Sequence, residues 1–337
     1  MALPSNDTVP SNDTVTLDDL DAAAKRLAGV AVVTPLIRLP YDTPQSDHNV
    51  YAKAESFQKT GSFKLRGAYN FLAALSADVR QRGVVAHSSG NHAQGVACAA
   101  HMFGVPATIV IPDNAPPVKV HRTEAWGAAV VRCAARDRVD VAEQIATEQN
   151  ATLVPPFDHP WIIAGQGTVG LEIAADLPNV ANVLVCTGGG GLLAGIATAL
   201  RERCPQAQII GVEPELAADA AESFRSGQLT AWDPSDTNRT VADGVRTPSL
   251  GQLNFDIIRR KVDGFVTVPE EAIRDMTRWY VLEARIVVEP TGAMTLAAYR
   301  QLLHGEVDGL TLQPGPTVVL VSGGNVETER LLELLSV

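Results

Sequence analysis

Residues 183–203, VLVCTGGGGLLAGIATALRER, place an apolar run, four glycines and a second apolar stretch in immediate succession. The run at 183–185 is typical of a short buried strand, and 192–203 is predicted to be a helix. On length alone, the uncharged residues 181–200 could span a bilayer. The glycines at 188–191 break that span, so we predict a strand–turn–helix unit and no membrane segment here.

Apolar strands and helices alternate in the same way through much of the chain. Before this unit we predict strands at 50–54, 83–87, 107–111, 129–132 and 151–154, with helices at 62–75, 91–103, 118–126 and 138–150. After it, strands are expected at 209–212, 264–268 and 317–321. Strands separated by helices form parallel sheets that are covered on both faces, so the predicted fold class is α/β.

Length and charge limit the possible organisation and partners. The 337 residues exceed the usual size of one hydrophobic core, which favours two lobes. The segment 155–160, PPFDHP, is the stiffest connector and is predicted to be a hinge. A net charge of -11 argues against nucleic acid or an anionic membrane as the main partner, so a small molecule is expected instead.

The N-terminus and the cysteines bear on where the chain works. The polar segment PSNDTV at 4–9 recurs at 10–15 and cannot bury a core, so 1–15 are predicted to be a flexible tail. Thr16 is the predicted N-cap of the first helix. No secretory leader is indicated. The cysteines are far apart in the sequence and indicate neither a zinc site nor a disulfide framework: Cys98, Cys133, Cys186 and Cys204. A reducing cytoplasm is therefore the expected location.

Lys64, in the segment TGSFKLRGA at 60–68, is the candidate for covalent chemistry. Most lysines are exposed, and a surface position is the alternative. The apolar neighbours Phe63 and Leu65 argue against it. A lysine that attacks a carbonyl group must be neutral, and burial beside apolar groups lowers its pKa in the required direction.

Two helix starts could bind the anionic groups of a cofactor and a substrate. The glycines at 188–191 offer backbone N–H groups to a phosphate, and the segment SSGNH at 88–92 could bind a carboxylate. A tight turn and a helix N-cap are the respective alternatives, and His92 could equally be a packed histidine. Together with Lys64, these motifs suit pyridoxal phosphate chemistry on an amino acid.

Ser322 follows the predicted strand 317–321, at the edge where open α/β sheets bind ligands. A serine facing a pyridine nitrogen would leave that nitrogen neutral. The ring would then be a weaker electron sink than one facing an aspartate, which favours β-elimination over transamination.

Two segments also match dinucleotide-binding patterns. Residues 165–170 fit G-x-G-x-x-G, and 189–194 fit the variant that ends in alanine. Neither is followed, about 20 positions on, by a convincing acidic residue at the end of a second strand, which the ribose contact of that fold requires. A nicotinamide-dependent enzyme is therefore the lesser interpretation.

Taken in order, the motifs resemble those of the fold type II pyridoxal phosphate enzymes, the family of serine/threonine dehydratases and serine racemases. The similarity runs from about Thr16 to the C-terminus and includes the Lys64 segment, SSGNH, IAGQGT at 163–168, the four glycines, Asp243-Gly244, EPTGA at 289–293 and SGGN at 322–325. It implies two open parallel-sheet domains similar to the tryptophan synthase β subunit. A large cofactor domain would comprise 16–77 and 158–337, and a small mobile domain 78–157.

The resemblance also implies a role for each matched residue. Lys64 would carry the cofactor as a Schiff base, between Phe63 and Gly244 on the two sides of the ring. Asn91 would hold the ring hydroxyl, and Glu289 would line the ring edge. Ser322 would face the pyridine nitrogen, and the phosphate would be held by Gly188, Gly189, Gly190, Gly191 and Leu192. The expected substrate contacts are Ser88, Ser89, Asn91, His92 and Arg138.

Similar enzymes bind a divalent cation at the spacing of Glu213, the Ala217 carbonyl and Asp219. Oxygen ligands of this kind suit Mg2+, or Ca2+ or Mn2+. An acidic helix start is the alternative.

Two residues bear on the subfamily. Ser89 stands where many threonine dehydratases carry alanine and where racemases and hydroxyaspartate dehydratases carry serine. Arg138 falls where some relatives use an arginine near the substrate, and a solvated helix position is its alternative.

The expected activity is elimination of water from an L-β-hydroxy amino acid such as serine or threonine, giving a 2-oxo acid and ammonia. Serine racemase, or a dehydratase specialised for 3-hydroxyaspartate or 3-phenylserine, is the alternative. A regulatory protein that binds the cofactor without turnover is disfavoured, because Lys64 and Ser322 are both present. The expected partners are the amino-acid substrate and, from the resemblance, a second copy in a homodimer.

Overall fold

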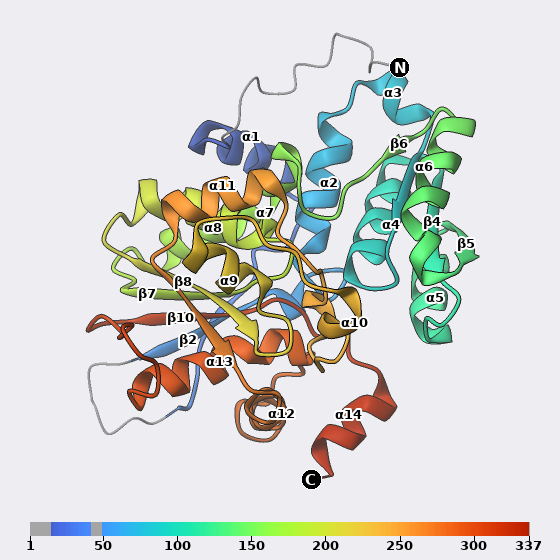
Figure 1. The fold of residues 1–337 in the computed structure, drawn as a ribbon. Helices are drawn as coiled ribbons and strands as arrows, with labels where there is room; N and C mark the ends of the chain where they lie inside the picture. The colour runs from blue at the N-terminus through green and yellow to red at the C-terminus, as the bar shows by residue number, and fades with distance from the viewer. Residues whose placement is uncertain (1–14, 42–48, 337) are drawn as a thin grey trace.

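The computed structural model describes residues 15–41 and 49–336, which form two sheets flanked by helices (Figure 1). The larger sheet has the strand order β1-β2-β10-β7-β8-β9; β1 is antiparallel to β2, and the other pairs are parallel. Its strands are β1 Leu36–Arg38, β2 Val50–Ala54, β7 Asn182–Cys186, β8 Gln208–Pro214, β9 Gly264–Val268 and β10 Thr317–Val321. The smaller sheet is parallel, in the order β5-β4-β3-β6, and comprises β3 Val84–His87, β4 Ala107–Pro112, β5 Ala129–Cys133 and β6 Thr152–Leu153. The predicted α/β class is confirmed.

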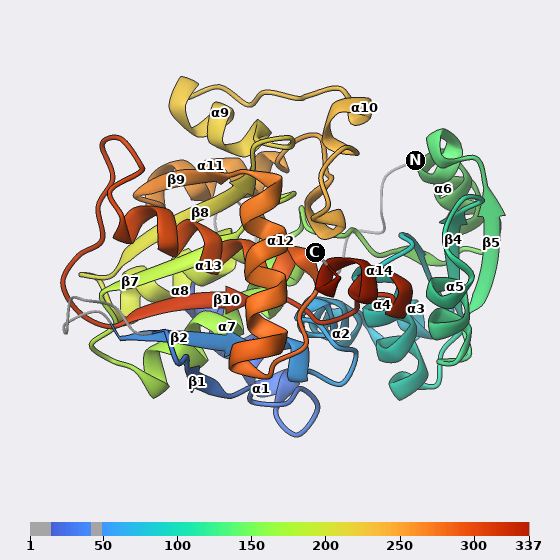
Figure 2. The ribbon, with the colours of Figure 1, turned by 90° about the horizontal axis from the view of Figure 1, so that it is seen from below.

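Helices cover both faces of the larger sheet, which explains why every residue of its inner strands β7 and β10 is buried. On one face, α8 (Gly191–Arg203) packs on β7 and is covered by α7 (Pro160–Asp176). On the other, α13 (Pro290–Leu303) lies against the strands and is covered by α12 (Glu270–Trp279), as Figures 1 and 2 show.

The remaining helices complete these layers. Around the smaller sheet lie α4 (Asn91–Phe103), α5 (Pro117–Glu124) and α6 (Arg138–Glu148). The others are α1 Leu17–Leu27, α2 Lys64–Ala74, α3 Ala77–Gln81, α9 Asp219–Ser226, α10 Pro234–Thr237, α11 Gln252–Lys261 and α14 Thr328–Leu335. Among the described residues, no helix is both long and apolar enough to cross a membrane.

Helix α2 packs against α4 of the smaller sheet and against α7 of the larger one. Glycines allow these helices to meet backbone to backbone. A Cβ atom on Gly95 of α4 would lie 3.0 Å from the carbonyl carbon of Lys64, and one on Gly165 of α7 would lie 2.6 Å from the carbonyl oxygen of Arg66. The first turn of α2 is therefore held between two backbones.

Several sequence predictions are confirmed. The helix at 91–103 and the strands at 264–268 and 317–321 have the predicted bounds, and 181–200 contains β7, the glycine turn and the start of α8. Thr16 caps α1, accepting from the Asp19 amide while the Asp19 carboxylate accepts from the Thr16 amide. The predicted tail lies outside the described residues except for Val15, which is 2% exposed.

The segment 160–176 differs from the prediction. Pro160 belongs to the first turn of α7, where its fixed φ angle suits a helix, so the connector is shorter than expected. The G-x-G-x-x-G match at 165–170 lies inside α7, and its glycines meet α2 and α8. These glycines allow close helix packing and do not follow a strand, as a dinucleotide-binding loop would. Strand β1 was also missed.

Candidate functional site

The predicted cofactor residues converge at the carboxyl ends of β7 and β10. The amide of Phe63 donates to the carbonyl of Ser322 at 3.1 Å, which joins the start of α2 to the end of β10. One cavity is lined by Phe63, Lys64, Gly188, Gly189, Gly190, Gly191, Leu192 and Gly244. Its other lining residues were not predicted: Pro156, Phe157, Ile162, Gln166, Cys186 and Thr247.

Lys64 is the first residue of α2 and extends into this cavity. Its Nζ donates to the carbonyl of Pro156 at 2.8 Å and lies 5.3 Å from the centre of the Phe63 ring. Burial lowers the pKa of Lys64 to about 8. A substantial fraction of the amine is therefore neutral near pH 8, as attack on a carbonyl group requires.

The glycine turn forms a cradle without side chains at the start of α8. Gly190 has a φ of +90°, and a Cβ atom on Gly189 would lie 2.3 Å from the ring of Phe157. The Asn254 amide donates to the Gly189 carbonyl at 2.6 Å and holds the turn in place. Backbone amides at the positive end of a helix suit a phosphate, so this turn fits the phosphate of pyridoxal phosphate.

Ser322 is 1% exposed, and among the described residues its hydroxyl makes no hydrogen bond of ordinary geometry, its polar neighbour being the weakly hydrogen-bonding thiol of Cys186. Buried hydroxyl groups are normally paired, so this one fits a ligand atom such as a pyridine nitrogen. Cys186, the last residue of β7, lies beside it, and burial raises the pKa of its thiol to about 11. The thiol therefore stays protonated at neutral pH.

Asn91 and Glu289 meet in a network beside the cavity. The Asn91 amide donates to the Glu289 carboxyl group at 2.8 Å. Asn325 donates its side-chain amide to the Asn91 oxygen at 2.8 Å and its backbone amide to Glu289 at 3.2 Å. Burial, followed by the charge of Asp243, raises the pKa of Glu289 to about 8. Three distant segments are thereby joined at one buried carboxyl group.

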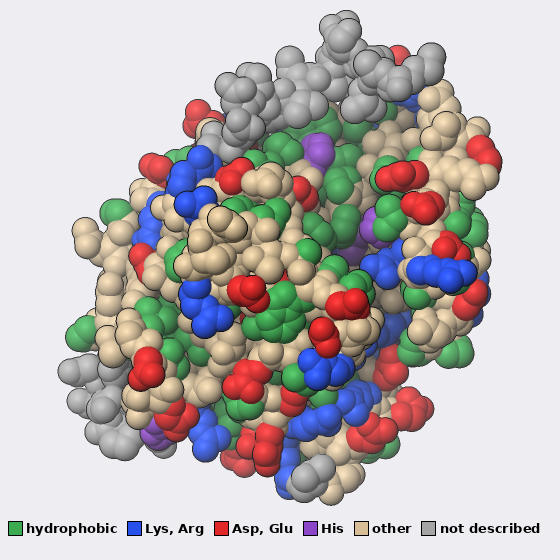
Figure 3. Space-filling model, viewed as in Figure 1, with side chains coloured by type: hydrophobic (Ala, Val, Ile, Leu, Met, Phe, Trp, Pro, Cys, Tyr) green, Lys and Arg blue, Asp and Glu red, His purple; other side chains and the backbone are tan. Residues whose placement is uncertain are grey.

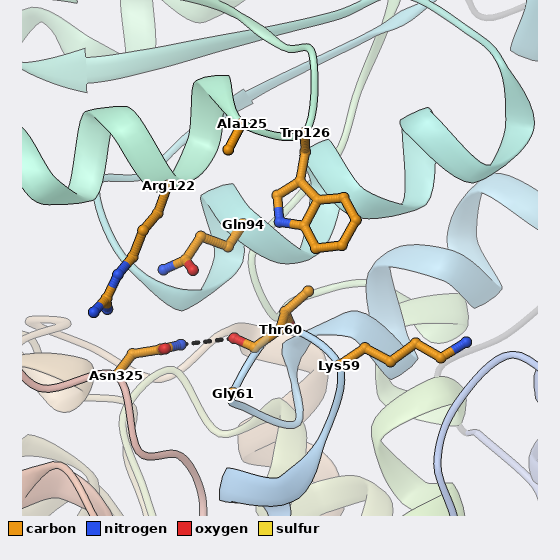
Figure 4. A pocket seen from close by; sticks show the side chains of 8 residues that line it. All are labelled: Lys59, Thr60, Gly61, Gln94, Arg122, Ala125, Trp126 and Asn325. Atoms are coloured by element: carbon orange, nitrogen blue, oxygen red, sulfur yellow. Dashed lines mark hydrogen bonds between the residues drawn. The ribbon is translucent and has the colours of Figure 1, made fainter.

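A second cavity of about 370 Å³ adjoins this network (Figure 4). Gln94, Arg122 and Trp126 lie on one side of it, and Thr60 and Asn325 lie on the other. The Asn325 side chain donates to the Thr60 carbonyl at 2.7 Å. Asn325 therefore belongs both to the wall of this cavity and to the network around Glu289.

The SSGNH segment forms the turn between β3 and α4. Ser88 accepts a hydrogen bond from the Gly90 amide at 3.2 Å, and Ser89 is half-buried. The ring of His92 is buried, with Nε2 3.1 Å from the carbonyl oxygen of Val154. Burial, followed by the charge of Lys64, lowers the pKa of His92 to about 3. This neutral, buried ring has the environment of a packed histidine, which is the alternative to the interpretation of His92 as a substrate contact.

Arg138 is exposed at the first position of α6 and donates to the carbonyl of Ala135 at 3.3 Å. The structure does not place it among the residues that line the Lys64 cavity. Its expected role in substrate selection stays a prediction.

The predicted cation ligands come together between β8 and α9. Glu213 accepts hydrogen bonds from the amides of Ala220 and Ala221 at 3.2 and 2.7 Å. Both carboxylate oxygens of Asp219 are buried without a partner, and Ala217 is also buried. Burial raises the pKa of Asp219 to about 7 and also raises that of Glu213. Unpaired buried carboxylate oxygens fit a hard cation. Within 15–41 and 49–336, no cluster of three or more His, Cys, Asp and Glu side chains is placed to hold a metal ion. A site built on the two carboxylates Glu213 and Asp219 would therefore need the Ala217 carbonyl as a third ligand.

Comparison with known proteins shows extensive similarity. The family described as "Pyridoxal-phosphate dependent enzyme" matches residues 28–323. The chain is 39% identical to the serine racemase of Schizosaccharomyces pombe, over 95% of this chain and 97% of that protein. It is 38% identical to the L-threo-3-hydroxyaspartate ammonia-lyase of Saccharomyces cerevisiae, over 95% and 96%. The solved structure of maize serine racemase superposes with a TM-score of 0.86 at 34% identity, covering 95% of this chain and 96% of that one.

Proposed function

Because the chain belongs to the family of pyridoxal-phosphate dependent enzymes, we propose that it eliminates water from an L-β-hydroxy amino acid of the serine/threonine type, giving a 2-oxo acid and ammonia. The observation that carries this proposal is the combination in one cavity of a lysine of lowered pKa with a glycine cradle. The unpaired Ser322 hydroxyl lies at the same strand ends. These features supply an amine, an anion site and a neutral partner for a pyridine nitrogen.

The residues of the cavity fit pyridoxal phosphate. Gly188 to Gly191 with Leu192 would hold the phosphate, and Phe63 and Gly244 would flank the ring. Ser322, which follows β10 beside the cavity residue Cys186, would face the ring nitrogen. Asn91 and Glu289 would lie toward the ring hydroxyl and edge. When bound, the cofactor supplies an electron-withdrawing ring joined to the substrate amine.

The side chains of this protein then handle the protons. Lys64, as a neutral amine, removes the α-proton from one face of the substrate. Because the Ser322 hydroxyl carries no negative charge, it would leave the ring nitrogen neutral. A neutral ring is a weaker electron sink, and this favours departure of the β-hydroxyl group over transamination. The SSGNH turn at the start of α4 would bind the substrate carboxylate through backbone amides and hydroxyl groups.

A substrate panel tests the proposal. L-serine, L-threonine, L-threo-3-hydroxyaspartate and 3-phenylserine should be assayed for 2-oxo acid and for inversion at the α-carbon. We expect oxo acid from L-serine or L-threonine as the main product. Inversion faster than elimination would instead identify a racemase, and higher kcat/KM for 3-hydroxyaspartate or 3-phenylserine would identify a specialised dehydratase.

Ser89 favours serine racemase as the second candidate. Racemisation needs a proton donor on the face opposite Lys64, and the hydroxyl of Ser89, in the turn before α4, is the candidate.

Ser89→Ala should lower interconversion of L- and D-serine by about 10²-fold or more while elimination from L-serine stays within a few-fold of wild type. Elimination from D-serine should be lost together with racemisation. Chiral chromatography and an oxo-acid assay measure both rates. Ser88→Ala is the matched control and should leave the ratio of the two rates unchanged. Undiminished racemisation by Ser89→Ala would show that Ser89 is not the proton donor on that face.

We further propose that Glu213, Asp219 and the Ala217 carbonyl bind Mg2+, or Ca2+ or Mn2+, as a structural ion. The unpaired oxygens of Asp219 support this proposal. The cation would offset the repulsion between two buried carboxylates and stabilise the junction of β8 and α9.

Chelation should lower the melting temperature by about 4 °C, since a ligand at 100 times its Kd stabilises the fold by about 2.7 kcal/mol and the unfolding entropy of 337 residues is about 0.7 kcal/mol/K. Activity should fall in parallel, and Mg2+ should restore both. Asp219→Asn should melt like the chelated wild type and should not respond to Mg2+. Glu215→Gln, which changes an exposed carboxylate of the same loop, should respond like wild type. A wild-type melting curve unchanged by chelator would refute the site.

We also propose that the protein is a cytoplasmic homodimer with a mobile small domain. The four cysteines are free thiols, which suits a reducing compartment. The exposed apolar side chains Val33, Phe57 and Val287 are candidates for the dimer contact.

The face drawn in Figure 3 mixes acidic and basic side chains, which suits a small-molecule enzyme better than a nucleic-acid-binding protein. The proposed division into domains is supported by the smaller sheet, all of whose strands lie within 78–157.

A further inference from the structure

Arg66 lies two residues after Lys64, in the first turn of α2, and is only 1% exposed. A buried guanidinium group is costly unless every N–H finds a partner. The proposed reaction assigns no role to this residue.

The guanidinium group of Arg66 is held by carboxylates on two sides. Its Nε and Nη2 atoms donate to the two oxygens of Glu55, each at 2.8 Å. Its Nη1 and Nη2 atoms donate to the two oxygens of Glu172 at 2.6 and 3.0 Å. Thr168 and the carbonyl of Val32 accept further bonds at 3.2 and 3.1 Å. Paired contacts of this kind fix the plane of the group as well as its position.

These partners belong to different layers of the fold. Glu55 follows β2, and Glu172 lies on α7. Lys53 of β2 also donates to Glu172, at 2.7 Å, so two buried cations face two carboxylates. The network therefore ties the first turn of α2 both to the larger sheet and to the helix that covers it.

Helix geometry connects this network to the cavity. Residues two apart on a helix point about 200° away from each other, so a side chain fixed on one side aims its neighbour at the other. Arg66 points toward Glu55 and Glu172, while Lys64 extends into the cavity and reaches Pro156. Rotation of this turn about its axis would move both side chains together.

We propose that Arg66 is a positioning residue, whose two carboxylate pairs fix the rotation of the first turn of α2 and so aim the Lys64 amine into the cofactor cavity. The inference rests on the proposed role of Lys64 as the cofactor lysine. It requires the guanidinium shape as well as the charge, because a lysine at 66 cannot pair with two carboxylates through two planar forks.

The test compares Arg66→Lys with Arg26→Lys. Arg26 is exposed and donates to Asn70, in the middle of the same helix, at 3.1 Å, so it is a matched substitution that leaves the first turn alone. The readout is the rate at which an amine-selective acylating reagent modifies Lys64 in cofactor-free protein, measured by peptide mass analysis. The rate is measured between about pH 6 and 11, because this range includes both the lowered pKa of Lys64 and the ordinary pKa of a lysine. This readout does not depend on turnover.

For Arg66→Lys we expect the acylation midpoint of Lys64 to rise by about one pH unit, because a misdirected amine is less desolvated. With cofactor bound, kcat should fall by about 10²-fold, as expected for a displacement near 1 Å, while KM changes by less than about threefold. Arg26→Lys should match wild type in both measurements. Should Arg66→Lys fail to fold, Glu172→Gln, which keeps the shape of one partner, should give a smaller shift in the same direction.

A lower melting temperature with an unchanged acylation profile and unchanged kcat would overturn the proposal and leave Arg66 a structural residue. Failure of the proposed function has a different signature. If Lys64 is not the cofactor lysine, Lys64→Ala will bind cofactor as wild type does, whereas the acylation result for Arg66→Lys is read without cofactor.

Discussion

Lys64→Ala will lose the visible absorbance of the lysine-bound cofactor and lower turnover by about 10³-fold or more. The amine is the group of lowered pKa that lines the cavity together with the glycine cradle, and alanine can neither bond to the cofactor nor accept the substrate's α-proton. Absorbance spectra of reconstituted protein and the rate of oxo-acid formation measure the two effects separately.

The control for this prediction is Lys25→Ala, which removes an exposed lysine from α1 and should leave both the spectrum and the rate unchanged. The fold of Lys64→Ala should survive, because the substitution truncates a side chain that extends into a cavity and breaks one hydrogen bond, to Pro156. A wild-type spectrum with a wild-type rate would remove Lys64 from the chemistry.

Gly165→Ala is expected to cost a large part of the protein's stability. Its Cβ atom would lie 2.6 Å from the Arg66 carbonyl oxygen and 2.7 Å from the Gly67 Cα atom, both of which are backbone atoms that no side-chain rotation can clear. The helices α2 and α7 must then separate, and overpacking of this kind costs about 3 kcal/mol. The melting temperature should fall by roughly 4 °C or more.

Ala175→Ser is the matched control, since Ala175 is an exposed position on α7 where the added atom meets solvent. Its melting temperature should stay within about 2 °C of wild type. Thermal unfolding followed by circular dichroism gives both values. Equal stability of Gly165→Ala and wild type would mean that α2 and α7 can separate freely, which their close backbone contact argues against.

The cavity around Lys64 was largely predictable because its parts are local in sequence. Lys64, the glycine turn and Ser322 each lie in a short motif beside a strand end or helix start, and parallel strands bring such ends to one edge of the sheet. Cys186 could have been found by the same reasoning, since it ends the strand that precedes the glycine turn.

Other features depend on tertiary contacts that no local pattern records. The Asn91, Glu289 and Asn325 network joins segments up to 234 residues apart. Helix α7 is rich in glycine, which in isolation disfavours a helix, and it is stabilised by close packing against α2 and α8. The buried pairing of Arg66 was likewise invisible, because an arginine in a sequence is expected at the surface.

The contact between Gly95 and the backbone of Lys64 has a mechanical consequence. Helix α4 belongs to the smaller sheet, yet at this point it rests on the main chain of the lysine itself, without an intervening side chain. If the smaller sheet rotates against the larger one, this close backbone contact would limit how far α4 can move relative to the main chain at Lys64. Parts of the smaller sheet far from this contact would then move farther than the Lys64 main chain.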